Sequence, residues 1–187
     1  STTLLIVAGA VLGFVLVSAH SVPFVDEAAH TIQVWLFTSG KLEIFAGTTM
    51  IPTYHAKLAL AERATGVHNI GFLRFVNLLG GLLLPVVVWR LVAMYSPQEA
   101  GRRTVQWFYM PLLFPFFFFV YTDVWTLTTV LATQLCALRK RYFLAAFAGL
   151  AATLLRQDMI VWVGMAWLLV LFGDSDFSAW RRGWQSL

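Results

Sequence analysis

Long apolar stretches with almost no charged side chains constrain this sequence of 187 residues more than any other feature. Residues 3–19 carry no charge, residues 70–92 form a second apolar stretch, and Asp123 is the only charged residue between positions 106 and 138. A helix needs about 20 mostly apolar residues to cross the hydrocarbon core of a bilayer. Charged residues make up 12% of the chain, against about 25% in soluble domains. We therefore predict an all-α integral membrane protein.

The lengths of these stretches predict about six spans in a single transmembrane domain over residues 1–187. As one helix, residues 106–138 would run about 50 Å, too long for a core of about 30 Å. A reversal at Tyr121-Thr122-Asp123 divides them into two short helices, and residues 142–155 and 159–172 form another short pair. Such short spans imply shallow helices around a recessed polar cavity, or local thinning of the bilayer. We expect residues 3–19 to be a retained helix rather than a signal peptide, and the chain to be the N-terminal part of a longer membrane domain.

Residues 24–69 form the one long polar segment between the spans. This segment is rich in aromatic and aliphatic side chains, so we expect it to be ordered. Pro23 favours a helix start. A second short helix is predicted over residues 57–64, ended by Gly66.

The first of these helices carries two carboxylates, an imidazole and an amide. Asp26 and Glu27 suit the positive end of a helix dipole. At about 100° per residue, Asp26, His30 and Gln33 share one stripe, and the opposite side is apolar, with Ala28, Ile32, Trp35 and Leu36. We predict that this helix lies in the membrane interface with its polar stripe facing water.

The distribution of basic residues predicts the topology of the chain. With residues 24–69 outside, seven basic residues fall on the cytoplasmic side: Arg102, Arg103, Arg139, Lys140, Arg141, Arg181 and Arg182. The outside then holds Lys41, Lys57, Arg63, Arg74 and Arg156, together with the acids Asp26, Glu27, Glu43, Glu62, Asp123 and Asp158. The polar turns that can build a site converge on the outer face. The net charge of +4 is too small and too dispersed to indicate a nucleic-acid partner.

The acidic helix start has three interpretations. Asp26 can be a general base that deprotonates an acceptor hydroxyl, with His30 and Gln33 orienting the substrate. The carboxylates and the imidazole can instead bind a divalent cation. The structural alternative is an acidic helix start beside a surface histidine.

Two arginines have comparable alternatives. Arg74 and Arg156 lie at the outer ends of helices, where a guanidinium can clamp a phosphate through paired hydrogen bonds or extend to the interface without binding a ligand. Arg156 is the better candidate because Gln157 and Asp158 share its tight turn. Asp123 can be a ligand-binding group or only the polar end of a hairpin.

Five short motifs occur in an order that resembles one enzyme family, the dolichol-phosphate-glucose-dependent alpha-1,2-glucosyltransferases. They are Asp26-Glu27-x-x-His30-x-x-Gln33, Thr48-Thr49 followed by Tyr54, Leu73-Arg74-Phe75-Val76-Asn77, Phe114-Pro115 with Tyr121-Thr122-Asp123, and Arg156-Gln157-x-x-Ile160-x-Trp162. In the second motif Pro52 is displaced by one position and the family's glycine is absent. In the fourth, Asp123 stands where the family has glutamate.

The resemblance implies a GT-C-type membrane glycosyltransferase whose site faces the lumen or periplasm. A hexose, glucose in this family, would pass with inversion from a lipid-phosphate donor to a lipid-linked glycan, without metal or cofactor. Asp26 and Glu27 would be the catalytic residues, and the substrate-binding residues would be His30, Gln33, Thr48, Thr49, Tyr54, Arg74, Asn77, Asp123, Arg156 and Gln157. The protein would reside in the endoplasmic reticulum membrane of a eukaryote or the cytoplasmic membrane of a prokaryote, in contact with membrane lipids.

The alternative from another functional class is a transporter or a non-catalytic membrane subunit. Charged residues and broken helices inside a membrane also mark transport pathways. In this sequence the charges lie at helix ends on one side rather than at the membrane midplane, which favours the enzyme.

Overall fold

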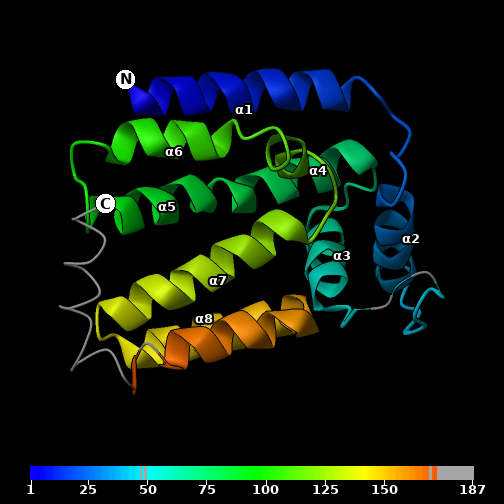
Figure 1. Ribbon diagram of the computed structural model, residues 1–187. Helices are drawn as coiled ribbons and strands as arrows, with labels where there is room; N and C mark the ends of the chain where they lie inside the picture. Colours follow the sequence, from blue (N-terminus) through cyan, green and yellow to red (C-terminus); the bar gives the residue numbers. More distant parts are fainter. Residues whose placement is uncertain (47, 49, 169, 172–187) are drawn as a thin grey trace.

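The structure, a computed structural model, describes residues 1–46, 48, 50–168 and 170–171, and all regular elements in these ranges are helical. Figure 1 shows one set of helices running side by side: α1 (Thr2–Ser18), α4 (Ile70–Gly81) continued by α5 (Leu83–Ala93), α6 (Ala100–Phe108), α7 (Asp123–Leu138) and α8 (Tyr142–Leu155). Two more helices, α2 (Glu27–Thr38) and α3 (Thr53–Thr65), run across one end of this set. The prediction of an all-helical fold is confirmed.

The longest apolar run is the pair α4 and α5, which meet at Leu82. From Ile70 to Ala93 this run is long and apolar enough to cross a membrane, the only such run in the described part of the chain. The apolar helices α1 and α8 are shorter than that limit. The predicted number of about six spans therefore stays a prediction.

Glycine allows α4 to approach α7 closely. A Cβ atom built on Gly80 would collide with the Trp125 indole, and one on Gly81 would contact Val124 and Phe117. This close packing places the first turn of α7 directly against α4.

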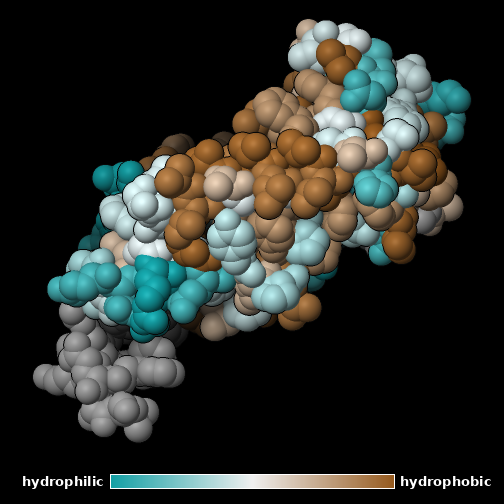
Figure 2. All heavy atoms as spheres, turned by 90° about the horizontal axis from the view of Figure 1, so that it is seen from above, coloured by the Kyte–Doolittle hydropathy of each residue, from teal (hydrophilic) through white to brown (hydrophobic). Residues whose placement is uncertain are grey.

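Apolar side chains cover the middle of the molecule, and more polar residues gather toward its two ends (Figure 2). Many of the apolar side chains are solvent-exposed, including Leu5, Leu12, Leu16, Leu79, Leu83, Phe143 and Phe147. Exposed apolar surface on this scale is typical of a lipid-facing belt and unusual for a soluble monomer.

The two ends of the bundle differ in charge. The end crossed by α2 and α3 also holds the start of α7 and the end of α8 (Figure 1). The acidic residues Asp26, just before α2, and Asp123, at the start of α7, therefore lie at the same end. The other end holds the turns from α5 to α6 and from α7 to α8, with the basic residues Arg102, Arg103, Arg139 and Arg141. This separation agrees with the predicted topology.

The helix expected to start at Pro23 begins instead at Glu27, after Val25 adopts a positive φ of 34°. Of the polar stripe predicted to face water, Asp26 is exposed and His30 is half-buried, but the prediction is wrong for Gln33. Gln33 is fully buried, where its amide nitrogen donates to the carbonyl of Glu43 (3.0 Å) and its oxygen accepts from the backbone N–H of Phe45 (2.6 Å). The loop after α2 folds back over the helix. The Gln33 amide, which helix periodicity predicted to face water, therefore binds the backbone of this loop. On the opposite side, which was expected to face the membrane, Ile32 and Trp35 are exposed.

The second short helix is confirmed as α3, which ends at Gly66 in the left-handed conformation (φ 71°). Its buried face joins residues of α2, α4 and α8 in a small apolar core: Val34, Tyr54, Leu58, Ala59, Ile70, Leu73, Val120 and Leu155. This core fixes α2 and α3 across the end of the bundle.

Residues 106–120 do not form the first helix of the predicted hairpin. The helix α6 ends at Phe108, and the chain then continues irregularly into a short 3₁₀ helix, η1 (Phe114–Phe117). Pro111 explains the difference, because a proline removes a backbone donor and disfavours the α conformation of the residue before it. The irregular segment packs Phe117 and Phe118 into the main apolar core and leads the chain to Asp123.

Candidate active site

The carboxylate of Glu27, the first residue of α2, is fully buried at the α2–α3 end. It forms a bidentate ion pair with the guanidinium of Arg74, with 3.0 Å between Nε and Oε1 and 2.7 Å between Nη2 and Oε2. The same oxygens accept backbone N–H groups of Val120 (2.9 Å) and Phe24 (3.0 Å). Four donors occupy the two oxygens, which is about the full capacity of a carboxylate.

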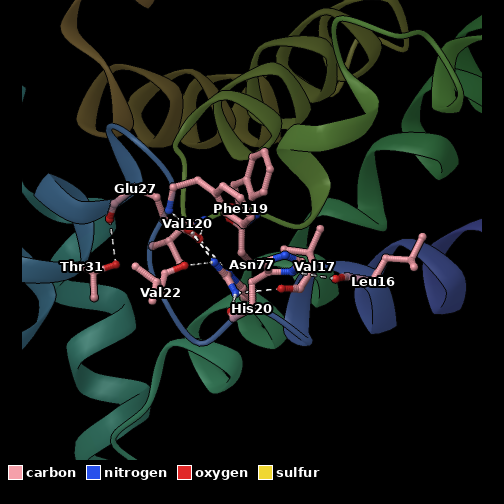
Figure 3. Close-up of polar contacts among 11 residues, drawn as sticks. Leu16, Val17, His20, Val22, Glu27, Thr31, Asn77, Phe119 and Val120 are labelled. Atoms are coloured by element: carbon pink, nitrogen blue, oxygen red, sulfur yellow. Dashed lines mark hydrogen bonds and ion pairs between the residues drawn. The ribbon is translucent and has the colours of Figure 1, made fainter.

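Arg74, from the second turn of α4, is equally saturated. Besides Glu27, it donates to the backbone carbonyls of Val17 (3.0 Å), His20 and Val22 (3.2 Å). These three residues, labelled in Figure 3 beside Glu27, lie at the end of α1 and just after it. These bonds use all five N–H groups of a guanidinium. Both partners of the Glu27–Arg74 ion pair are fully buried, so the pair binds four segments of the chain together and leaves no donor or acceptor free for a ligand.

Asn77 and Tyr54 form a second internal connection. The Tyr54 hydroxyl donates to Asn77 Oδ1 (2.8 Å), and the Asn77 amide nitrogen lies within hydrogen-bond distance of the carbonyls of Phe116 (3.1 Å), Phe117 (3.2 Å) and Phe119 (2.7 Å). Burial raises the pKa of Tyr54 well above its usual value, so the phenol stays protonated as a donor. This contact holds the irregular segment before α7 against α3 and α4.

Next to the Glu27–Arg74 and Tyr54–Asn77 contacts lies a group of more accessible polar side chains that still have free hydrogen-bonding groups. Asp26, beside Glu27 in the chain, has an exposed side chain that makes no capping hydrogen bond. His30 is half-buried, with its ring 5.3 Å from that of Tyr121. Burial lowers the pKa of His30, and the nearby carboxylates of Asp123 and Asp26 offset this shift only in part. His30 is therefore neutral at pH 7.

Arg156 extends this group from the end of α8. Its Nη1 lies 3.0 Å from Asp123 at the start of α7, and its Nη2 lies 3.3 Å from Asp158. The side chains of Arg156 and Asp123 are 33% and 38% exposed. Because only two of its five N–H groups have partners among the described residues, Arg156 can still donate to an anionic ligand.

A cavity of about 520 Å³ opens beside the Asp123–Arg156 ion pair. Its wall is mainly apolar and comes from α7, the segment before it and the residues after α8, including Met110, Leu112, Leu127, Leu131, Met159 and Trp162. The sequence predicted a recessed polar cavity. The observed cavity is instead mainly apolar: among the described residues, Asp123 and Arg156 are the only charged side chains in its wall, and most of the others are aliphatic or aromatic.

Comparison with known proteins identifies the family. The model of the DIE2/ALG10 family matches residues 20–181, most of the chain. The chain belongs to the DIE2/ALG10 family. Three relatives named Dol-P-Glc:Glc(2)Man(9)GlcNAc(2)-PP-Dol alpha-1,2-glucosyltransferase come from Arabidopsis thaliana, Debaryomyces hansenii and humans; they are 27%, 29% and 24% identical over 75%, 79% and 75% of this chain. The chain covers 32%, 36% and 34% of them, about a third of their length. No solved structure matches it.

In this member of the DIE2/ALG10 family, the residues singled out from the sequence divide into two groups. Glu27, Gln33, Tyr54, Arg74 and Asn77 are buried and bonded to other parts of the chain. The accessible group contains Asp26, His30, Asp123, Arg156 and Gln157, of which Gln157 is exposed at the start of the 3₁₀ helix η2 (Gln157–Met159). The structure therefore brings the first and last motifs of the DIE2/ALG10 resemblance to the same end of the molecule.

The threonine motif is only partly described. The Thr48 hydroxyl is buried without a hydrogen-bond partner among the described residues, and Thr49 lies outside them. Within the described ranges no three histidine, cysteine or acidic side chains are arranged to hold a metal ion.

Sequence reasoning did not single out a functional role for two side chains of α3, His55 and Lys57. His55 is fully buried, its Nε2 lies 2.8 Å from His30 Nδ1, and burial lowers its pKa to about 3. Lys57 places its ammonium group over the Trp125 indole, and burial lowers its pKa to about 6. The sequence offers no signal for the His30–His55 contact, because the two residues are 25 positions apart and on different helices.

Proposed function

We propose that this chain forms part of a membrane glucosyltransferase that transfers glucose from a lipid-phosphate donor to a lipid-linked glycan. Membership of the DIE2/ALG10 family and the shared name of the relatives support the substrate classes. The observation that carries the proposal is the juxtaposition of an exposed carboxylate, a neutral imidazole and a partly free arginine beside an apolar cavity.

Asp26 is the proposed general base. A base must be ionised and accessible to the hydroxyl that it serves, and Asp26 is exposed whereas its neighbour Glu27 is saturated. For Glu27 the proposed role is accordingly structural, which revises the catalytic role expected from the sequence. By the same reasoning, the proposed role of Arg74 is no longer to bind the donor phosphate but to hold the start of α2 in place.

Arg156 is the proposed partner of the donor phosphate. In the reaction, the acceptor hydroxyl attacks the anomeric carbon of glucose, its proton passes to the Asp26 carboxylate, and the bond from that carbon to the lipid-phosphate oxygen breaks with inversion. Charge then develops on the departing phosphate, where a guanidinium donor stabilises it. Asp123 and Asp158 orient Arg156, and the adjacent apolar cavity suits the hydrocarbon part of the donor lipid.

The proposed site faces the lumen or periplasm, because the basic turns at the opposite end favour the cytosol. Impermeant thiol labelling tests this orientation. With Cys136, the only cysteine of this sequence, and any cysteine outside it replaced by serine, cysteines introduced at Thr48 and Lys140 should label from opposite sides of the membrane. Labelling of both from one side would refute the topology.

Transfer of radiolabel tests the activity itself. Membranes that contain the full-length protein are incubated with dolichyl-phosphate [³H]glucose and a lipid-linked oligosaccharide that lacks the terminal glucose. We expect label in the oligosaccharide, with none in membranes that lack the protein. A folded protein that moves no label into the oligosaccharide would refute the proposal and return the transporter to consideration.

A further inference from the structure

The contact between His30 and His55 is a directed hydrogen bond. The nitrogens are 2.8 Å apart, the ring planes differ by 18°, and the ring centroids are 5.1 Å apart. An imidazole N–H lies in the plane of its ring, so two nearly coplanar rings let the proton on one nitrogen point at the lone pair of the other. One ring must donate and the other must accept.

The second nitrogen of His55 determines which ring donates. His55 is fully buried, and its Nδ1 has no hydrogen-bond partner among the residues that the structure describes. Unpaired buried N–H groups are rarer in proteins than unpaired acceptors. A proton on Nδ1 is therefore disfavoured, so the proton of His55 resides on Nε2 and His55 is the donor to His30.

The form of His30 follows from this direction. Because its Nδ1 accepts, a neutral His30 carries its own proton on Nε2. No described residue pairs with His30 Nε2, and this nitrogen is not among the buried polar atoms without partners, so it reaches accessible space. Tyr121 lies beside the ring, and the carboxylates of Asp26 and Asp123 act on it from the same region.

We infer that His55 is a positioning residue that fixes His30 in its Nε2–H form, so that His30 donates a hydrogen bond to a hydroxyl oxygen of the glycan acceptor. The donor role rests on the proposed function, whereas the tautomer rests on the His30–His55 geometry alone. Asp26 accepts the proton of the attacking hydroxyl, and His30 binds a neighbouring hydroxyl of the same sugar. The two side chains thus contribute one acceptor and one donor to the recognition of adjacent hydroxyl groups.

Nitrogen NMR tests the tautomer without any activity measurement. The full-length protein, labelled with ¹⁵N-histidine, is reconstituted in lipid nanodiscs, and the His30 signals are assigned by their loss in His30→Gln. We expect an unprotonated Nδ1 and a protonated Nε2 on His30, with a coupling across the hydrogen bond to His55. A protonated Nδ1 on His30 would overturn the inference.

Two variants of His55 then separate positioning from packing. His55→Gln retains an N–H donor near the position of Nε2, whereas His55→Leu retains bulk without a donor. Loss of one hydrogen bond changes an equilibrium by about threefold to tenfold. We expect His55→Leu to mix the His30 tautomers and to lower glucose transfer by that factor, with His55→Gln within about twofold of wild type.

An unchanged His30 tautomer in His55→Leu would also overturn the inference. If His55→Leu does not fold, the inference is tested by the His30 tautomer in the wild-type spectrum and by the transfer rate of His55→Gln. A wild-type protein with the expected tautomer but no glucose transfer would instead refute the proposed function and leave the role of His55 intact.

Discussion

Two carboxylate–arginine pairs at the same end of the molecule differ in almost every physical respect. The Glu27–Arg74 ion pair is fully buried, bidentate and surrounded by five further hydrogen bonds to the backbone. The Asp123–Arg156 ion pair has one direct contact, is about one-third exposed and borders a cavity of about 520 Å³.

The difference shows how to separate a structural arginine from one that can bind a ligand. Both arginines were candidates for binding phosphate, since each lies near the outer end of a helix. Free hydrogen-bonding capacity distinguishes them: Arg74 has none left, whereas Arg156 retains several N–H groups beside accessible space. The same criterion separates the adjacent acids Asp26 and Glu27.

The largest expected effect is on catalysis and comes from Asp26. Asp26→Asn removes basicity while keeping size, and asparagine is an equally good residue at a helix N-cap. Loss of a general base costs about 10²- to 10⁴-fold, so the rate of glucose transfer should fall by that factor with an unchanged thermal midpoint. Retention of the wild-type rate would place the base elsewhere.

The next largest effect is on stability and comes from the buried pair. Glu27→Gln leaves the guanidinium of Arg74 buried without its counter-charge, and breaking a buried ion pair in this way costs about 3–5 kcal/mol. We expect a marked fall in the thermal midpoint of the detergent-solubilised protein. Glu43→Gln, an exposed acid on the following loop, is the matched control and should change stability by less than about 0.5 kcal/mol. A stable Glu27→Gln protein with no transfer activity would reverse the roles of Asp26 and Glu27.

A smaller catalytic effect is expected at the exposed pair. A hydrogen bond to a charged group contributes about 1.5–3 kcal/mol, which corresponds to about a tenfold to hundredfold loss of transfer in Arg156→Ala. Arg156→Lys keeps the charge but not the paired geometry, so it should recover only part of this loss at wild-type expression. A wild-type rate of transfer in Arg156→Ala would refute the proposal that Arg156 binds the donor phosphate.

The smallest effect is expected for the stability of that pair. Exposed ion pairs contribute about 0.2–1 kcal/mol, so a double-mutant cycle of Asp123→Asn and Arg156→Gln should give a coupling within this range. The corresponding cycle for Glu27 and Arg74 should give several times more. Equal coupling energies in the two cycles would contradict the conclusion that the buried pair stabilises the fold more than the exposed pair does.

Much of the fold could be predicted from local sequence. The apolar stretches predicted α1, α4 with α5, and α8, and Gly66 predicted the end of α3. The irregular segment after Phe108 was missed although its cause, Pro111, is local, because the apolar character of residues 106–120 was given more weight than the backbone limits of proline. The buried position of Gln33 could not be predicted by helix periodicity, since it depends on a loop that returns over α2.

The candidate site was less predictable than the fold. Sequence motifs drew attention to Asp26, Glu27, Arg74 and Arg156, but spacing along the chain does not reveal which charges meet. Arg74 and Glu27 are 47 residues apart and Arg156 and Asp123 are 33 apart, so their pairing is decided by tertiary packing. Which carboxylate is saturated and which is free is therefore knowledge that only the structure supplies.

The Glu27–Arg74 ion pair also sets an order for biosynthesis. Glu27 accepts from Val120, which is made 93 residues later; at about 5–20 residues per second, its shell of donors is complete only about 5–20 s after Glu27 itself has been synthesised. During that interval α1 and α2 are already made, but the groups that hold them together are missing. The polar end of this domain therefore matures late, because Glu27 can meet Arg74 after 47 residues but lacks its last donor until Val120 has been made.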